Sequence, residues 1–260
     1  MSTILARIVE DRVRRLTKQK GLTSLEVLEQ DARNKPPSLD FVGSFTGSGP
    51  CIIAEVKKAS PSRGVIKQNL DVRALAGAYE QGGAVAVSVL TEEDHFRGSL
   101  SVLEEVRRTV SLPILRKDFI TDPYQIVEAR AAGADSFLLI AAILEEGALK
   151  QLIRFGRKWR MEPLVEIHNL SELHRALQTD ALVLGINNRD LTTFGVDLST
   201  TIDLVKRIPR DRTVISESGI STREDVLRLA DAGVHGFLIG ETLVRSDDPA
   251  GKIRELRNGI

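Results

Sequence analysis

Short apolar runs alternate with longer amphipathic stretches from residue 51 onward, and this alternation limits the possible folds more than any other feature. It predicts a parallel sheet whose strands are joined by helices packed outside the sheet. Eight runs are predicted as strands, at residues 51–56, 85–90, 114–117, 136–140, 164–167, 182–186, 214–217 and 236–239. Eight strand–helix units over residues 49–260 are typical of a closed (β/α)8 TIM barrel, an α/β fold.

An open, doubly wound sheet is the alternative fold for such a pattern. In its dinucleotide-binding form, that fold carries a G-x-G-x-x-G motif directly after its first strand. The residues that follow the first predicted strand, 57–64, contain no such motif. The closed barrel is therefore the preferred prediction, and residues 49–260 are expected to form it as one catalytic domain.

Residues 1–48 precede the repeat and are predicted to form an N-terminal helical extension. Apolar side chains recur there at helical spacing, at Leu5, Ile8, Val9, Val13 and Leu16. Basic residues between them would also suit a transit peptide, but Glu10 and Asp11 interrupt that pattern. We expect a helix packed on the mouth or flank of the barrel. A second short helix is expected at 24–33, and the Gly/Ser stretch at 43–49 is interpreted as a boundary.

Composition excludes several classes of partner. Hydrophobic residues make up 42% and charged residues 28% of the chain, values typical of a globular protein. The 36 basic and 36 acidic side chains cancel, so bulk charge does not attract nucleic acid. The longest uncharged apolar run, 137–144, is far shorter than the roughly 18 residues that suggest a membrane span. Cys51 is the single cysteine and cannot form an internal disulfide, which favours a reducing cytoplasm.

Polar and charged side chains gather at the carboxyl ends of five predicted strands, where barrels of this kind carry their reactive groups. They are Glu55, Lys57, Lys117, Glu166, Asn187, Arg189 and Glu217. Such crowding shifts proton affinities and is the usual setting for acid/base chemistry. Each charge alone could be a structural ion pair, but five strand ends together favour one site. Arg116 and Asp118 alternate with Lys117 and are expected to be structural residues on the opposite face.

Two glycine turns at neighbouring strand ends suggest a phosphate site. Ser218 and Gly219 follow the seventh predicted strand, and Gly240 and Glu241 follow the eighth. Glycine lets backbone amides approach an anion closely, and phosphate-binding barrels hold their ligand at this position. Tight turns with no ligand are the alternative interpretation.

Other candidate sites are weaker. The four histidines, His95, His168, His174 and His235, show no spacing typical of a metal site, so we expect no metal and ordinary packing or surface roles. Cys51 opens an apolar strand and is expected to be a buried packing residue rather than a nucleophile. Phe96 and Phe119 lie close to the predicted mouth. They could wall a flat apolar ligand or pack in the core.

At these residues the chain resembles the indole-3-glycerol phosphate synthase family over nearly its whole length, N-terminal extension included. The most diagnostic stretch is Glu55-Val-Lys57-Lys-Ala-Ser60-Pro-Ser. Four further stretches follow in the family's order: Leu115-Arg-Lys117-Asp-Phe119, Val165-Glu166, Gly185-Ile-Asn187-Asn-Arg189-Asp-Leu191 and Ser216-Glu217-Ser218-Gly219-Ile. Glu241 differs from the serine of some members, at a contact expected to run through the backbone.

The resemblance implies a carboxy-lyase of tryptophan biosynthesis. Its substrate would be 1-(2-carboxyphenylamino)-1-deoxyribulose 5-phosphate, which closes a ring and loses carbon dioxide and water to give indole-3-glycerol phosphate. Lys117 would be the general acid on the ketone oxygen, and Glu166 would assist the acid/base steps on the departing hydroxyl. Lys57 would hold the substrate carboxylate and share the dehydration step with Glu55.

The resemblance also assigns the binding residues. Asn187, Glu217 and Ser218 would position the sugar hydroxyls and the lysines, and Arg189 would set the electrostatics of the mouth. Phosphate would be bound by Ser60, Gly219, Gly240 and Glu241. The aromatic ring would be enclosed by Phe96, Phe119, Leu138 and Leu191. No step requires a cofactor, and no cofactor is expected.

Two other functions stay open at this point. A related phosphate-binding barrel could use Lys57 or Lys117 as a Schiff-base nucleophile, or could isomerise a sugar phosphate with Glu166. A barrel of this kind could also bind a phosphosugar without turnover. We expect a small phosphorylated substrate and a monomeric enzyme, with contacts to other enzymes of the same pathway left open.

Overall fold

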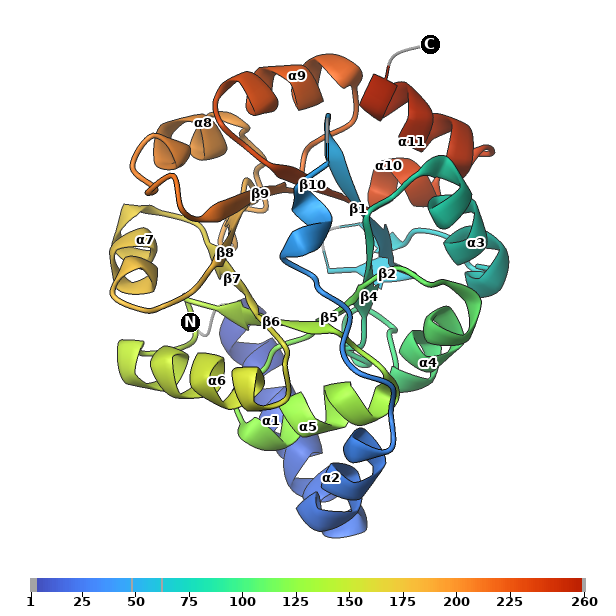
Figure 1. Ribbon diagram of the computed structural model, residues 1–260, viewed down its shortest axis with the longest axis vertical. Helices are drawn as coiled ribbons and strands as arrows, with labels where there is room; N and C mark the ends of the chain where they lie inside the picture. The colour runs from blue at the N-terminus through green and yellow to red at the C-terminus, as the bar shows by residue number, and fades with distance from the viewer. Residues whose placement is uncertain (1–3, 48, 62, 259–260) are drawn as a thin grey trace.

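Eight parallel strands close into a barrel in the computed structural model, which describes residues 4–47, 49–61 and 63–258 (Figure 1). The strands, in their order around the barrel, are β1 Cys51–Val56, β4 Ala86–Leu90, β5 Ile114–Lys117, β6 Ser136–Ile140, β7 Leu164–Ile167, β8 Val183–Asn187, β9 Thr213–Glu217 and β10 Gly236–Ile239. The predicted barrel is confirmed, and each predicted strand agrees with the observed one to within one residue at either end.

Helices cover the outside of the barrel; they connect successive strands, except for the last two helices, which follow β10. They are α3 Val72–Gly82, α4 Leu100–Thr109, α5 Pro123–Ala132, α6 Glu146–Lys158, α7 Leu170–Leu177, α8 Ser199–Val205, α9 Arg223–Asp231, α10 Glu241–Val244 and α11 Pro249–Asn258. Side-chain oxygens accept hydrogen bonds from first-turn amides at several helix starts, at Asp71, Ser99, Asp122, Asn169 and Thr222. These N-caps explain where the helices begin.

Alternate residues of each strand face two different hydrophobic cores, one inside the barrel and one between the strands and the outer helices. In β1, Cys51 and Ile53 face the barrel interior, whereas Ile52, Ala54 and Val56 pack against the surrounding helices. Cys51 is buried, as expected for a packing residue. Because the period of a strand is two residues, the same pattern carries Glu55 inward at the carboxyl end.

The amino-terminal end of the barrel is closed by residues that precede β1. Phe41 and Phe45, which lies in the 3₁₀ helix η1 Gly43–Phe45, join the interior cluster. Their ring centroids lie 5.1 Å apart at an interplanar angle of 85°. A Cβ on Gly236, the first residue of β10, would come within 3.0 Å of the Phe45 ring, so Gly236 leaves room for it. The stretch interpreted as a boundary therefore also fills the barrel floor.

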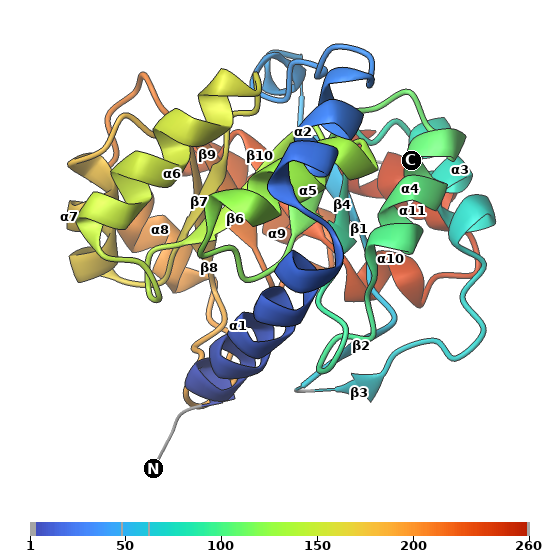
Figure 2. The same ribbon diagram turned by 90° about the horizontal axis from the view of Figure 1, so that it is seen from below.

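Two helices precede the barrel, as predicted. Helix α1 spans Ile4–Leu22 and α2 spans Leu25–Arg33 after the N-cap Ser24. In Figure 2, α1 runs across the end of the barrel that also carries the small hairpin of β2 Ala59–Ser60 and β3 Gly64–Val65. The sequence patterns did not predict this hairpin. Ser62, which belongs to the quoted motif, lies outside the described residues, and so does Ser48 of the Gly/Ser stretch.

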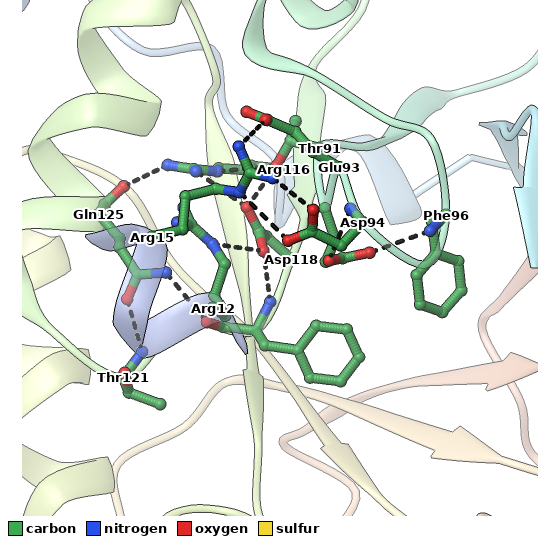
Figure 3. A network of polar contacts seen from close by, with 12 residues as sticks. Arg12, Arg15, Thr91, Glu93, Asp94, Phe96, Arg116, Asp118, Thr121 and Gln125 are labelled. Atoms are coloured by element: carbon green, nitrogen blue, oxygen red, sulfur yellow. Dashed lines mark hydrogen bonds and ion pairs between the residues drawn. The ribbon is translucent and has the colours of Figure 1, made fainter. Parts of the chain in front are cut away.

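A buried ionic network fastens α1 to the barrel (Figure 3). Arg12 donates to Asp118 at 3.1 Å and lies 3.6 Å from Glu128, while Arg116 pairs with the same two carboxylates at 2.9 and 2.8 Å. Thr91 donates to Asp118 at 2.7 Å. Burial opposes ionisation of Asp118, but the two arginines lower its pKa below the usual value. Arg116 and Asp118 are thus structural residues, as predicted.

We expect Arg12→Met to destabilise the protein by roughly 3 kcal/mol, because removal of one partner leaves buried carboxylates undercompensated. Urea unfolding would measure this change. Arg14→Met is the matched control, since Arg14 lies on the same helix and pairs with Asp11 at the surface. We expect that control to change stability by less than about 1 kcal/mol. Equal unfolding midpoints for both variants would show that the network does not hold α1 in place.

Over residues 4–47, 49–61 and 63–258, no helix has both the length and the apolar character that a membrane crossing requires.

Candidate active site

A cavity of about 620 Å³ opens at the carboxyl end of the barrel, under α1. All sixteen residues expected to act there line it: Glu55, Lys57, Ser60, Phe96, Lys117, Phe119, Leu138, Glu166, Asn187, Arg189, Leu191, Glu217, Ser218, Gly219, Gly240 and Glu241. They come from the strands of the barrel and from the loops that follow those strands. The structure therefore brings the residues together in one place.

Lys117 is the central cation of this cavity. Its Nζ donates to Glu166 Oε2 and to Glu217 Oε2, each at 2.6 Å. The three side chains come from β5, β7 and β9, whose alternation aims them inward from different sides of the barrel. All three residues are buried. A buried ammonium held by two carboxylates is a fixed proton donor.

The charges around Lys117 shift its proton affinity and those of its partners. Burial disfavours the ammonium, but Glu166, Glu217 and Glu55 outweigh this effect and raise the pKa of Lys117 above its usual value. Burial likewise disfavours the Glu166 carboxylate, yet Lys117 and His168 hold its pKa below the usual range. For Glu217, burial is the largest effect, and it raises the pKa to about 7 despite Lys117. The two carboxylates are thus inequivalent.

Gly185, on β8, makes room for Glu217 on the neighbouring strand β9. A Cβ at this position would lie 2.2 Å from Glu217 Oε1, so only glycine fits beside that carboxylate in this arrangement. Oε1 itself is buried and has no hydrogen-bond partner. A buried acceptor without a donor is costly. In this arrangement the oxygen faces Gly185 and its capacity to accept a hydrogen bond is unused.

Lys57 and Glu55 form a second ion pair at the end of β1, with Nζ 2.5 Å from Glu55 Oε2. Gly240 lies against this pair, because a Cβ there would stand 2.2 Å from Glu55 Oε2 and 3.2 Å from Lys57 Nζ. Glycine at residue 240 thus makes room for the charged pair. Lys57 is less buried than Lys117, which suits contact with a charged ligand group.

The loop after β9 has the strained backbone that a close anion contact uses. Ser218 and Gly219 both adopt left-handed conformations, with φ of 66° and 82°. Asn188, buried beside them, donates from Nδ2 to the Glu217 and Ser218 carbonyls at 3.0 Å each. Left-handed residues other than glycine are uncommon and gather at functional sites.

Glu241 opens the short helix α10 and is flanked by two arginines. Its carboxylate lies 3.5 Å from Arg63 Nε and accepts a hydrogen bond from Arg245 Nε at 3.0 Å. All three line the cavity. The sequence patterns did not single out Arg63 or Arg245. Both are surface arginines far apart in sequence, and only the fold brings them to the same rim.

Apolar side chains wall the opposite part of the cavity. The rings of Phe96 and Phe119 lie 6.1 Å apart at 40°. Ile4, Leu5 and Ile8 of α1 line the same cavity, although the sequence patterns did not name them as site residues. Leu5 and Ile8 belong to the apolar face predicted for the N-terminal helix. Helical periodicity identifies such a face but does not tell which surface of the barrel it covers.

His168, which the sequence predicts to have an ordinary packing or surface role, borders the site. It lies next to Glu166 and is mostly buried. Among the described residues no cluster of histidine, cysteine and carboxylate side chains could hold a metal ion.

Comparison with known proteins shows which family the chain resembles. The family model described as "Indole-3-glycerol phosphate synthase" matches residues 5–256. An indole-3-glycerol phosphate synthase of Albidiferax ferrireducens is 43% identical over 260 residues, which cover 98% of each chain. The Desulforamulus reducens protein of that name is 49% identical over 223 residues, 85% of this chain and 84% of the relative. A third, from Dehalococcoides mccartyi, is 47% identical over 257 residues, 97% and 99% of the two chains.

Solved structures resemble the chain at lower identity. A thiamine phosphate pyrophosphorylase from Pyrococcus furiosus has a TM-score of 0.59 at 16% identity and covers 80% of this chain and 93% of its own. A tryptophan synthase complex from the same organism also has a TM-score of 0.59, at 19% identity over 80% and 98% of the two chains. At such identities the similarity concerns the fold alone.

Proposed function

The chain belongs to the indole-3-glycerol phosphate synthase family, and from this premise we propose how its cavity performs the reaction. The protein is a carboxy-lyase of tryptophan biosynthesis. It converts 1-(2-carboxyphenylamino)-1-deoxyribulose 5-phosphate to indole-3-glycerol phosphate by ring closure, decarboxylation and dehydration.

Lys117 is the general acid of ring closure in this proposal. The ring carbon that bears the carboxylate attacks the sugar ketone, and the ketone oxygen gains negative charge that a nearby ammonium stabilises and protonates. The observation that carries this role is the Lys117 ammonium, held at 2.6 Å by two carboxylates in the cavity. Loss of carbon dioxide then restores the aromatic ring.

Dehydration requires a second acid and a base. Glu166 exchanges protons with the departing hydroxyl, and Lys57 with Glu55 holds the substrate carboxylate and then assists departure of water. Glu217 positions Lys117 through Oε2, and together with Asn187 and Ser218 it orients the sugar hydroxyls. The inequivalent carboxylates beside Lys117 support this division, because Lys117 and His168 hold the pKa of Glu166 below its usual range despite burial, whereas burial raises the pKa of Glu217.

Binding groups surround these catalytic ones. Phosphate lies between Ser60, the amides at Gly219 and Gly240, and the start of α10 at Glu241. The aromatic ring lies among Phe96, Phe119, Leu138 and Leu191, and Arg189 sets the local potential. We further propose a division into the extension 1–48 and the barrel 49–260, a monomeric enzyme located in the cytoplasm, and no nucleic-acid partner.

Formation of the indole chromophore from substrate tests this function. We expect indole fluorescence to rise with time, after correction for Trp159. A Schiff-base enzyme would instead be fixed to its substrate by borohydride, because reduction makes that bond permanent. Binding without fluorescence would indicate a phosphosugar-binding barrel and contradict the proposed function.

We expect Gly219→Val to weaken the binding of substrate and of inorganic phosphate together, by about 1 to 3 kcal/mol for each charge-assisted hydrogen bond that the variant no longer makes. Gly219 has a φ of 82°, and a Cβ there would lie 2.4 Å from Val196 Cγ1, so the loop must move. Calorimetric titration with both ligands measures the effect.

Gly233→Val is the matched control for that variant. Gly233 has a φ of 105°, and its Cβ would make only an ordinary 3.7 Å contact with Val205, outside the cavity. It therefore introduces similar backbone strain without touching the phosphate site. Unchanged affinity in a folded Gly219→Val protein would remove Gly219 from the site.

A further inference from the structure

The loop after β4 carries Phe96 and is built around a buried carboxylate. It spans residues 91–98, between β4 and α4. Glu92 is only 1% exposed, whereas Asp94 and Arg97 on the same loop are exposed. An irregular segment of this kind has no helix or sheet to pair its backbone amides, so its shape depends on other hydrogen bonds.

Three consecutive backbone amides donate to the Glu92 carboxylate. The amide of Asp94 lies 3.0 Å from Oε1, and those of His95 and Phe96 lie 2.8 and 2.9 Å from Oε2. Both carboxylate oxygens are therefore used within the loop. Hydrogen bonds to a carboxylate are stronger than those between neutral groups, and they offset the cost of burying one.

The rest of the loop closes on the same residue. The Glu92 carbonyl accepts from the Gly98 amide at 2.8 Å, which brings the two ends of the loop together. Gly98 also packs on the end of β4, since a Cβ there would lie 2.2 Å from the Leu90 carbonyl oxygen. Arg97, between Phe96 and Gly98, has a left-handed backbone with φ of 54°. Such a backbone is uncommon outside glycine and persists where the surrounding contacts hold it.

Phe96 is the residue of this loop that reaches the substrate cavity. Its ring lies 6.1 Å from that of Phe119, and both line the cavity. The Phe119 amide also donates to a buried carboxylate, that of Asp118, at 2.8 Å. Each ring of the aromatic wall thus belongs to a residue whose backbone amide is bound to a buried acid.

Partly exposed ion pairs hold the outer face of the loop to α1 (Figure 3). They join Arg15 to Glu93 and Asp94, and Asp11 to His95. Exposed pairs contribute little to stability. The buried hydrogen bonds of Glu92 are therefore the contacts that define where Phe96 lies.

We propose that Glu92 is a positioning residue of the active site, which acts through Phe96 and whose role rests on the proposed function. Its carboxylate fixes the backbone from which the Phe96 ring enters the cavity, so the wall is in place before the aromatic ring of the substrate arrives. Preorganised contacts bind more tightly, because the free protein is already ordered. Loss of the carboxylate weakens binding of the aromatic end of the substrate and leaves the phosphate end unaffected.

A double-mutant cycle on Glu92 and Phe96 tests this role. We expect Phe96→Ala to raise KM about tenfold, because aromatic contact with the substrate ring is lost, while kcat changes by less than about threefold. Glu92→Ala should have a similar effect, since it releases the three amides that place the ring. In the double variant the two effects should not add, because Glu92 no longer has a ring to position. Titration calorimetry should give the wild-type affinity for inorganic phosphate in all three variants.

Glu92→Gln keeps the shape and one acceptor oxygen, so its KM should lie between those of wild type and Glu92→Ala. It also supports the same cycle with Phe96→Ala if the alanine variant fails to fold. Glu93→Gln is the matched control, because Glu93 lies on the same loop but pairs with Arg15 at the surface. Its KM should match that of wild type.

Additive effects of the two substitutions, a KM of Glu92→Ala within about twofold of wild type, a loss confined to kcat, or an equal loss of phosphate affinity would each overturn the positioning role. A wild-type protein that forms no indole contradicts the proposed function instead. The two failures are distinguishable, because the first is seen only in variants of an active enzyme.

Discussion

Lys117→Met is expected to lower turnover by a factor of about 10² to 10⁴, or more, while substrate still binds. The general acid and the charge that stabilises the developing alkoxide are removed together. Phosphate and carboxylate contacts lie elsewhere in the cavity, so affinity should change much less. Turnover from indole fluorescence and affinity from titration calorimetry separate the two effects.

Lys117→Arg separates the effect of the substitution on catalysis from its effect on the stability of the fold. Methionine leaves Glu166 and Glu217 buried without their cation, which also destabilises the fold. Arginine keeps the charge but does not release its proton, so we expect it to be nearly as inactive while it retains more stability. Lys158→Met controls for loss of an exposed lysine outside the cavity. Retention of more than about a tenth of turnover in Lys117→Met would exclude Lys117 as the acid.

The raised pKa of Lys117 determines the pH range in which kcat/KM can fall through loss of its proton. A raised folded-state pKa keeps the ammonium loaded until the pH rises above its usual value of about 10.4. The alkaline loss of kcat/KM that depends on Lys117 should therefore lie above that pH. Neutral solutions should show no loss from deprotonation of this residue.

Glu166→Gln is expected to depress turnover by a factor of about 10² or more with little change in affinity. Glutamine keeps the shape and one acceptor, but it exchanges no proton with the departing hydroxyl. It also leaves Lys117 and His168 without the carboxylate that lies between them. Steady-state kinetics with substrate titration measures both quantities.

Glu162→Gln is the matched control for this loss of a carboxylate. Glu162 lies just before β7, at the opposite end of the barrel, and pairs with Arg157 outside the cavity. We expect turnover close to wild type in that variant. If Glu166→Gln raised KM while leaving kcat intact, Glu166 would be a binding group and its acid/base role would be wrong.

The strand ends of this barrel could be predicted because their side chains follow a strict period of two. In β1, the alternation of Ile52 and Ile53 between two cores directs Glu55 into the mouth. The same rule correctly separated Lys117 from its structural neighbour Arg116. Residues on parallel strands reach the same edge of a sheet, so sequence alone was enough to group them.

Contacts between segments distant in sequence could not be predicted in this way. Phe45 fills the barrel floor, and Arg63 meets Glu241 at the rim. No local periodicity encodes either contact. The contact between His168 and Glu166 depends on the rotamer of Glu166, which presents a different oxygen to His168 and to Lys117. Such features depend on side-chain packing that only the folded chain defines.

The most direct measurement of the ring-closing decarboxylation counts two products in one reaction. Wild-type protein is incubated with substrate labelled at the carboxyl carbon, and released carbon dioxide and indole-3-glycerol phosphate are quantified together. We predict that both accumulate at the same rate and in equal amounts until the substrate is consumed. Release of either product without the other, or neither from substrate that binds, would contradict a lyase that closes the ring and decarboxylates in one catalytic cycle.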